Sequence, residues 1–262
     1  MNSDSEMVVV VEGLIKQFAG PESPTVTAVN DVSFELPRGK MIVIKGPSGC
    51  GKSTLLNLIG ALEKPTAGSI VVDGINVPEI SGRDEVMYRL QKVGFVSQYC
   101  YLVPNLAALE NVMLPMDLLG VERKSQKERA RRLLERVGID VHRQASPVAR
   151  LPAGEQQRVA IARALTSAPA VILADEPTSK LDLGTSRPIV ELLQGLTREG
   201  ETVILATHEV DIAAKADIVL EMTDGRIRQA SPSANEQGDA DLSSWKPAPT
   251  SRAEPQPLRR SR

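Results

Sequence analysis

The stretch GPSGCGKST at residues 46–54 decides the fold. It fits the pattern G-x-x-x-x-G-K-[ST], which forms a phosphate-binding loop when a strand precedes it and a helix follows it. Residues 41–44 are an apolar run, as expected of a buried strand, and apolar side chains at helical spacing begin at Leu55. The sequence therefore predicts a P-loop between a strand and a helix.

The residue types in this loop match what phosphate binding requires. Glycines let several backbone N–H groups approach one phosphate, and the helix N-terminus adds partial positive charge. We expect Lys52 to reach the β- and γ-phosphates, the Ser53 hydroxyl to bind Mg²⁺, and Thr54 to contact a further phosphate. The residues expected to hold the phosphates are Gly46, Pro47, Ser48, Gly49, Cys50, Gly51, Lys52, Ser53 and Thr54.

Other apolar runs indicate an α/β fold. Residues 170–174 and 202–206 are continuously apolar apart from one threonine, which is typical of strands buried on both faces of a parallel sheet. Residues 32–36 and 70–74 alternate between apolar and polar side chains, which predicts edge or antiparallel strands closer to the N-terminus. Helical patterns lie between these runs, so strands and helices alternate along the chain.

The middle of the chain, about residues 100–165, is predicted to be a helical subdomain. Apolar side chains recur at helical spacing from Ala130 to Val137. Ser125 and Glu128 form a capping-box pattern, which predicts a helix start at Ser125, and Gly138 predicts its end.

Composition excludes several classes of protein. The 262 residues include 33 acidic and 31 basic side chains, and only 3% are aromatic. This near balance argues against nucleic acid as a partner, because phosphate neutralisation needs concentrated positive charge and base stacking needs aromatic rings. No stretch approaches the roughly 20 apolar residues of a membrane-spanning helix. The two cysteines, Cys50 and Cys100, form no disulfide framework, so we expect reduced thiols in the cytoplasm.

Two carboxylates end the apolar run at residues 171–174. Asp175, at the end of a strand beside the phosphate loop, can reach the Mg²⁺ sphere through water, and Glu176 can orient and polarise an attacking water. The alternative is a pair of exposed acids that begin a turn before Pro177. The P-loop earlier in the chain favours the catalytic interpretation.

The sequence resembles the nucleotide-binding subunits of ATP-binding-cassette (ABC) transporters. Residues 151–165, LPAGEQQRVAIARAL, look like the signature of that family and its following helix. Residues 175–182, DEPTSKLD, resemble the acid motif and the D-loop of the family. Residues 95–98, FVSQ, resemble its Q-loop, and residues 207–208, TH, resemble the segment with its switch histidine. The resemblance covers residues 8–229. Residues 56–68 and 109–112 look like the lipoprotein-release, macrolide-export and cell-division branch.

The resemblance implies an α/β P-loop NTPase with an antiparallel β-subdomain and a helical subdomain. It also implies roles for single residues. Glu176 is the catalytic base, assisted by Lys52 and by His208 at the γ-phosphate, and Gln98 ligates Mg²⁺ together with Ser53 and Asp175. The residue expected to cross a dimer interface is Asp182, and the one expected to stack on adenine is Phe18. Phe18 as an ordinary core residue is the alternative.

The same resemblance implies partners and a location. The chain is expected to bind ATP and Mg²⁺, to dimerise on MgATP with a second nucleotide-binding subunit, and to drive a separate membrane (permease) subunit. It would then be a cytoplasmic protein, peripheral on the cytoplasmic face of the membrane. The alternatives are a weakly hydrolysing regulatory cassette and a non-transport ABC ATPase.

The signature departs from the usual Leu-Ser-Gly-Gly. Pro152 replaces the serine and Ala153 the first glycine, followed by Gly154 and Glu155. In the family this segment caps the nucleotide held by the other chain of a dimer, and proline removes both a hydroxyl and an N–H. A proline at a helix start is sterically acceptable, so the helix should form. Three outcomes remain open. They are a homodimer that hydrolyses ATP slowly, a heterodimer with a partner whose signature is intact, and a site in which contacts by Gly154 and Glu155 compensate for the two changes.

Domain boundaries follow from a change in composition. We expect an ABC-type nucleotide-binding domain over residues 1–229 and a disordered tail over residues 230–262, which is rich in proline, serine and arginine. The alternative for the tail is a docking segment, with Trp245 as its anchor or the pair Arg259 and Arg260 at anionic lipid.

Overall fold

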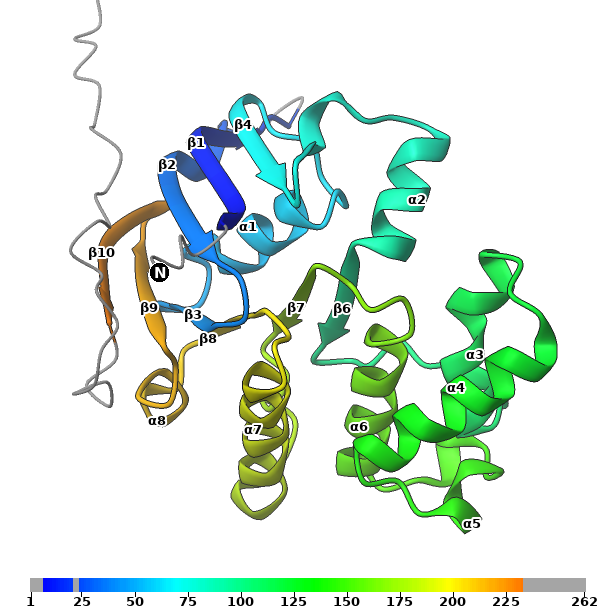
Figure 1. Ribbon diagram of the computed structural model, residues 1–262. Helices are drawn as coiled ribbons and strands as arrows, with labels where there is room; N and C mark the ends of the chain where they lie inside the picture. Colours follow the sequence, from blue (N-terminus) through cyan, green and yellow to red (C-terminus); the bar gives the residue numbers. More distant parts are fainter. Residues whose placement is uncertain (1–6, 21–23, 233–262) are drawn as a thin grey trace, which may run out of the picture.

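A six-stranded sheet forms the centre of the computed structural model, which describes residues 7–20 and 24–232 (Figure 1). Its strands lie in the order β10 (Arg226–Pro232), β9 (Ile218–Thr223), β3 (Met41–Lys45), β8 (Val203–Thr207), β7 (Val171–Asp175) and β6 (Val93–Ser97). The strands from β9 to β6 run parallel, and β10 is antiparallel to β9. The predicted parallel sheet is confirmed.

A second, antiparallel sheet packs near the first. Its strands lie in the order β2 (Val26–Pro37), β1 (Met7–Phe18), β4 (Ala67–Val72) and β5 (Ile75–Asn76). The alternating runs at residues 32–36 and 70–74 fall in β2 and β4, as predicted for antiparallel strands. Helix α1 (Lys52–Ile59) contacts strands of both sheets and so fills the space between them (Figure 1).

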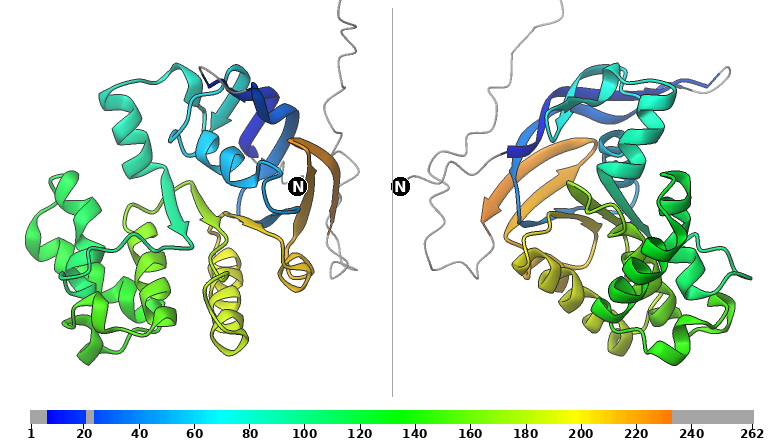
Figure 2. Two further views of the ribbon diagram at one scale, coloured as in Figure 1. Left: turned by 180° about the vertical axis from the view of Figure 1, so that it is seen from behind. Right: turned by 45° about the vertical axis from the view of Figure 1, so that its right-hand side comes forward.

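The remaining helices gather mainly on the other side of the large sheet, and Figure 2 shows α3 to α6 together at one end. They are α2 (Arg83–Gln91), α3 (Ala108–Leu118), α4 (Arg123–Arg136), α5 (Val141–Gln144), α6 (Ala153–Ala164), α7 (Leu183–Arg198) and α8 (Val210–Ala213). Helices α3 to α6 lie within residues 100–165, where a helical subdomain was expected. Within the described part of the chain, no helix has the length and apolar character needed to cross a bilayer.

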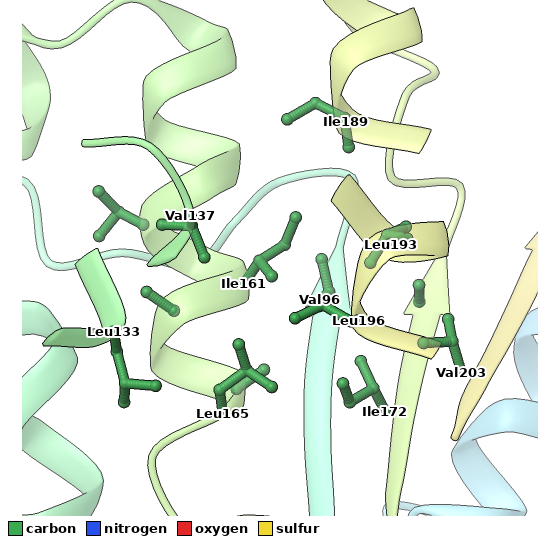
Figure 3. Close-up of a cluster of buried hydrophobic side chains, with 14 of the residues drawn as sticks. Val96, Leu133, Val137, Ile161, Leu165, Ile172, Ile189, Leu193, Leu196 and Val203 are labelled. Carbon is green, nitrogen blue, oxygen red and sulfur yellow. The ribbon is translucent and has the colours of Figure 1, made fainter. Parts of the chain in front are cut away.

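The central strands separate two hydrophobic cores. Successive side chains of a strand point to opposite faces, so Met41 and Val43 join the core under the helices, whereas Ile42 and Ile44 join the core around α1. Figure 3 shows the first core, where Ile161 of α6 and Leu193 of α7 pack near Ile172 of β7. Burial on both faces explains why these strands are continuously apolar.

The predicted start of one helix is wrong. Helix α4 begins at Arg123 with Glu122 at its N-cap, not at Ser125, whose hydroxyl donates to the Glu122 carboxylate. The side chain of Gln126 donates to Asp117 and to the Val121 carbonyl, which ties the first turn to the preceding loop. The predicted end at Gly138 is confirmed, because α4 ends at Arg136 and Gly138 has a φ of +80°.

The last strand crosses the expected tail boundary. β10 continues to Pro232, three residues beyond residue 229, because backbone pairing with β9 needs no apolar side chains. The rest of the expected tail, residues 233–262, including Trp245, Arg259 and Arg260, lies outside the described residues.

Two glycines give a matched test of packing. A β-carbon on Gly94 of β6 would lie 2.6 Å from the carbonyl oxygen of Ala164, whereas one on Gly195 of α7 would have no neighbour within 4 Å. Gly94→Ala is expected to destabilise the fold by about 1–3 kcal/mol through overpacking. Gly195→Ala should leave stability unchanged or raise it by up to about 1 kcal/mol, because alanine favours helix. Urea unfolding of both variants measures the difference, and equal stabilities would contradict this account of the α6–β6 contact.

Candidate functional site

The P-loop connects β3 to α1 and is pressed between the two sheets. A β-carbon on Gly46 would collide with the carbonyl oxygen of Met222 in β9, and one on Gly51 with that of Ala28 in β2. Gly51 also has a φ of +108°, which side chains rarely adopt. Glycine is therefore required at both positions, and the loop backbone is held at the carboxyl ends of the parallel strands, where α/β folds bind ligands.

Lys52 is the first residue of α1, and its side chain is 5% exposed. The ammonium donates to the carbonyl oxygens of Gly46 at 2.8 Å and Pro47 at 3.0 Å, and lies 3.8 Å from the Glu176 carboxylate. A buried ammonium among loop carbonyls is placed to meet a phosphate held by the same loop. The structure therefore brings the predicted lysine and the predicted base together.

Ser53 and Asp175 form a pair suited to a divalent cation. The Ser53 hydroxyl donates to Oδ1 of Asp175 at 2.9 Å. Burial raises the pKa of Asp175, against the lowering effect of the Ser53 hydrogen bond. Among residues 7–20 and 24–232, no cluster of three or more His, Cys, Asp or Glu could hold a metal ion by itself. One hydroxyl and one carboxylate nevertheless fit Mg²⁺, which usually keeps waters and substrate phosphates as its other ligands.

Glu176 has an unusual backbone and a partly unpaired carboxylate. Its φ is +46°, and its N–H donates to the carbonyl of Ala206 in β8 at 3.0 Å. Oε1 lies 3.0 Å from Nδ1 of His208, while Oε2 is buried with no hydrogen-bond partner among the described residues. A buried carboxylate oxygen is costly unless it accepts a hydrogen bond, so Oε2 fits a bound water. Strained backbone is common at active sites.

Gln98 follows β6 and reaches the acid motif through a residue that the sequence did not reveal. The Ser179 hydroxyl, which is placed to donate, lies 3.0 Å from Oε1 of Gln98 and 3.0 Å from the Glu176 carbonyl. In the described residues, Gln98 is hydrogen-bonded to Ser179 and not to Ser53 or Asp175. Ser179 carries no local pattern that would have singled it out.

Phe18 ends β1, and 42% of it is exposed. The ammonium of Lys16 lies 4.8 Å from the centre of its ring. This exposure excludes the alternative that Phe18 is an ordinary core residue, and leaves its ring available for stacking.

The signature segment forms a cavity of its own. Pro152 is the N-cap of α6, so the helix forms despite the proline, as predicted. A β-carbon on Gly154 would lie 2.3 Å from Cγ2 of Thr185 in α7, so any larger residue there would force that side chain to move. The cavity, of about 350 Å³, is lined by residues from Pro152 to Glu155 and by residues of the D-loop, including Asp182.

Asp182 caps helix α7. Its carboxylate accepts from the backbone N–H of Thr185 at 3.0 Å and from the hydroxyl of Thr185 at 2.9 Å, and these bonds hold the pKa of Asp182 below its ordinary value. Neither Asp182 nor the signature is hydrogen-bonded or ion-paired to Lys52 or Glu176 among the described residues.

A partly buried arginine supports the segment after Gln98. Arg163 of α6 donates to the carbonyl oxygens of Cys100 at 2.6 Å and Tyr101 at 2.7 Å. Both of those residues have positive φ angles, +58° and +44°. The segment presents exposed rings at Tyr99 and Tyr101, which are 55% and 71% exposed. The two hydrogen bonds of Arg163 were not predicted from the sequence, although a basic residue in the apolar second half of α6 was a signal for them.

Known proteins resemble the chain over most of its length. Residues 29–179 match the family described as ABC transporter. An "Uncharacterized ABC transporter ATP-binding protein" of Thermotoga maritima is 45% identical over 202 residues, which are 77% of this chain and 86% of that protein. "Macrolide export ATP-binding/permease protein MacB 1" of Yersinia pestis bv. Antiqua is 40% identical over 240 residues, 91% of this chain but 37% of that protein.

A solved structure agrees with the fold. The ATP-binding cassette MJ0796, described as a dimer in a post-hydrolysis state bound to ADP and Pi, superposes with a TM-score of 0.78 at 35% identity, covering 86% of this chain and 98% of the other. The expected resemblance, including its macrolide-export branch, is supported by these relatives. With a P-loop, an acid pair and a histidine at the ends of adjacent parallel strands, the chain belongs to the ABC transporter family, as an ATP-binding cassette that hydrolyses ATP.

Proposed function

We propose that this chain is the MgATP-dependent subunit of an ABC transporter, that it dimerises on MgATP, and that it drives a separate membrane subunit from the cytoplasmic face of the membrane. The observation that carries the proposal is the convergence of Lys52, Ser53, Asp175, Glu176 and His208 at one edge of the sheet. The proposed nucleotide-binding domain runs through β10, to residue 232.

The chemistry follows from charge placement. Mg²⁺, when bound, would neutralise charge on the phosphates, and Ser53 and Asp175 are the residues that would hold it. Gln98, which is hydrogen-bonded to Ser179, is the further expected ligand. Lys52 and the loop N–H groups bind and orient the phosphates. Glu176 holds the attacking water through Oε2, and His208, next to Oε1, fixes the orientation of that carboxylate. Phe18 stacks on the adenine.

A weakly hydrolysing, regulatory cassette is the second candidate. The observation that favours it is Pro152, which as the N-cap of α6 supplies neither a hydroxyl nor an N–H to a nucleotide held by a second chain. The intact Lys52, Asp175, Glu176 and His208 favour the first candidate. In a homodimer both nucleotide sites would be capped by a signature that contains Pro152, whereas in a heterodimer the number depends on the signature of the other chain.

The surface beside Gln98 suits a membrane partner. Tyr99, Tyr101 and Val103 expose apolar surface next to Gln98 in the chain. Aromatic side chains are enriched at protein interfaces because they bury much area at low entropic cost. The rigid backbone under Tyr101, held by Arg163, keeps the rings in place for docking.

Glu176→Gln tests the catalytic base. The amide keeps the size of the side chain but cannot accept a proton, so ATP turnover should fall by about 10²–10⁴-fold. Nucleotide binding, measured by calorimetry, should change little. Glu79→Gln, an exposed glutamate outside the site, serves as the matched control and should retain full turnover. Turnover by the Glu176 variant at the control rate would contradict the assignment.

Pro152→Ser combined with Ala153→Gly tests the signature. A restored charge-assisted hydrogen bond is worth about 1.5–3 kcal/mol, so turnover should rise by roughly 10–100-fold if this segment caps the nucleotide of a second chain. Pro152→Ala restores the N–H without the hydroxyl and separates the two effects. The rate is measured against protein concentration, because a dimeric site responds to it. An unchanged rate in the double variant would count against capping by this segment.

Tyr99→Ala combined with Tyr101→Ala tests the docking surface. Loss of two exposed rings should lower the fraction of the chain that co-sediments with membranes containing its permease by about tenfold or more, since interface aromatics often contribute 2 kcal/mol or more. Val141→Ala removes an exposed apolar side chain from α5, where 59% of Val141 is exposed, and should have no effect. Equal losses in both variants would argue against a specific surface.

A further inference from the structure

A second cavity lies at the end of the large sheet opposite the P-loop. Its volume is about 470 Å³, within the usual range of ligand sites. Lys92 and Ala170, which line it, directly precede β6 and β7, whereas Asp175 and Glu176 lie at the far end of β7. The cavity is therefore separate from the nucleotide site.

Three parts of the fold contribute to this cavity. Arg38 directly follows β2, and Asp73 directly follows β4, so both come from the small sheet. Gln91 is the last residue of α2. The end of α3 and the middle of α4 supply Met116 and Arg129. Figure 1 shows α2 between the small sheet and the helices α3 and α4. A molecule bound here would contact the small sheet, the core and the helical subdomain at once.

Positive charge dominates the lining. Arg38 and Lys92 each donate to Asp73 at 2.6 Å, through different carboxylate oxygens. Hydrogen bonding to Lys92, and then to Arg38, holds the pKa of Asp73 below its ordinary value, so this carboxylate stays ionised. Arg129 has no hydrogen-bond or ion-pair partner in the part of the chain that the structure describes. Three of the residues that line the cavity are cations and one is an anion, and Arg129 is the cation whose charge no described acid offsets, which favours an anionic ligand.

An apolar wall completes the cavity. Met116, which is buried, lines the cavity together with Leu119 and Val121, from α3 and the loop that follows it. Val121 is 37% exposed. Cations on one side and aliphatic side chains on the other suit an anionic group attached to an apolar one, because arginine binds phosphate through a planar fork while the apolar part leaves water.

We propose that this cavity binds a small organic phosphate monoester, with the phosphate between Arg129, Lys92 and Arg38 and its apolar substituent against Met116, Leu119 and Val121. The bound molecule links α4 to the ends of the strands. It is a ligand site distinct from the P-loop, and it is independent of the proposed function.

Phenyl phosphate is a suitable probe, because it joins a dianion to an apolar ring. Calorimetry is performed on the full chain saturated with MgADP, so that the P-loop is already filled. We expect one binding site per chain, and inorganic phosphate should bind about tenfold more weakly because it lacks the apolar contact. Absence of binding by phenyl phosphate at millimolar concentration would overturn the proposal.

Arg129→Gln should weaken binding of phenyl phosphate by about tenfold or more, since a charge-assisted hydrogen bond is lost. Arg131→Gln removes another exposed cation from the same helix, outside the cavity, and should stay within about twofold of the unmodified chain. Equal weakening of binding in both variants would show only a general electrostatic attraction of the anion to α4 and would refute the site. Val121→Asp, which places a carboxylate at the apolar wall, should abolish binding, and full binding by that variant would also refute it.

Discussion

The close approach of the P-loop to two backbone carbonyls positions everything around the phosphate site. Gly46 lies against Met222 of the large sheet and Gly51 against Ala28 of the small one, so the loop is held from both sides. Because α1 starts immediately after the loop, the first residues of the helix take their positions from it. Lys52 and Ser53 then meet Glu176 and Asp175, which follow a different strand.

The strand-end residues were predictable from the sequence for a geometric reason. Parallel strands end at one edge, so a loop after β3, acids after β7 and a histidine after β8 had to converge there. The strands themselves were predictable because burial on two faces makes them continuously apolar. Composition could not indicate how far β10 continues, because its pairing uses backbone atoms.

Other features depend on contacts between distant residues, which no local pattern records. The start of α4 is fixed by Gln126 and its bonds to the preceding loop, and this outweighed the capping-box pattern at Ser125. Ser179 reaches Gln98 across 81 positions, and Arg163 reaches Cys100 across 63. Whether Phe18 was exposed or buried was likewise undecided by the sequence, since the alternation along β1 permits either.

The two hydrogen bonds that Arg163 donates have a consequence for how the surface around Tyr99 and Tyr101 changes in evolution. The backbone from Cys100 to Tyr101 keeps its shape through hydrogen bonds from the partly buried guanidinium of Arg163 to two carbonyl oxygens. The exposed rings of Tyr99 and Tyr101 take no part in those hydrogen bonds. The bonds that hold the backbone therefore do not depend on which side chains stand at these two positions. Single substitutions at these positions can thus alter which protein is recognised while folding is conserved, so a duplicated copy can acquire a new partner without rebuilding its nucleotide chemistry.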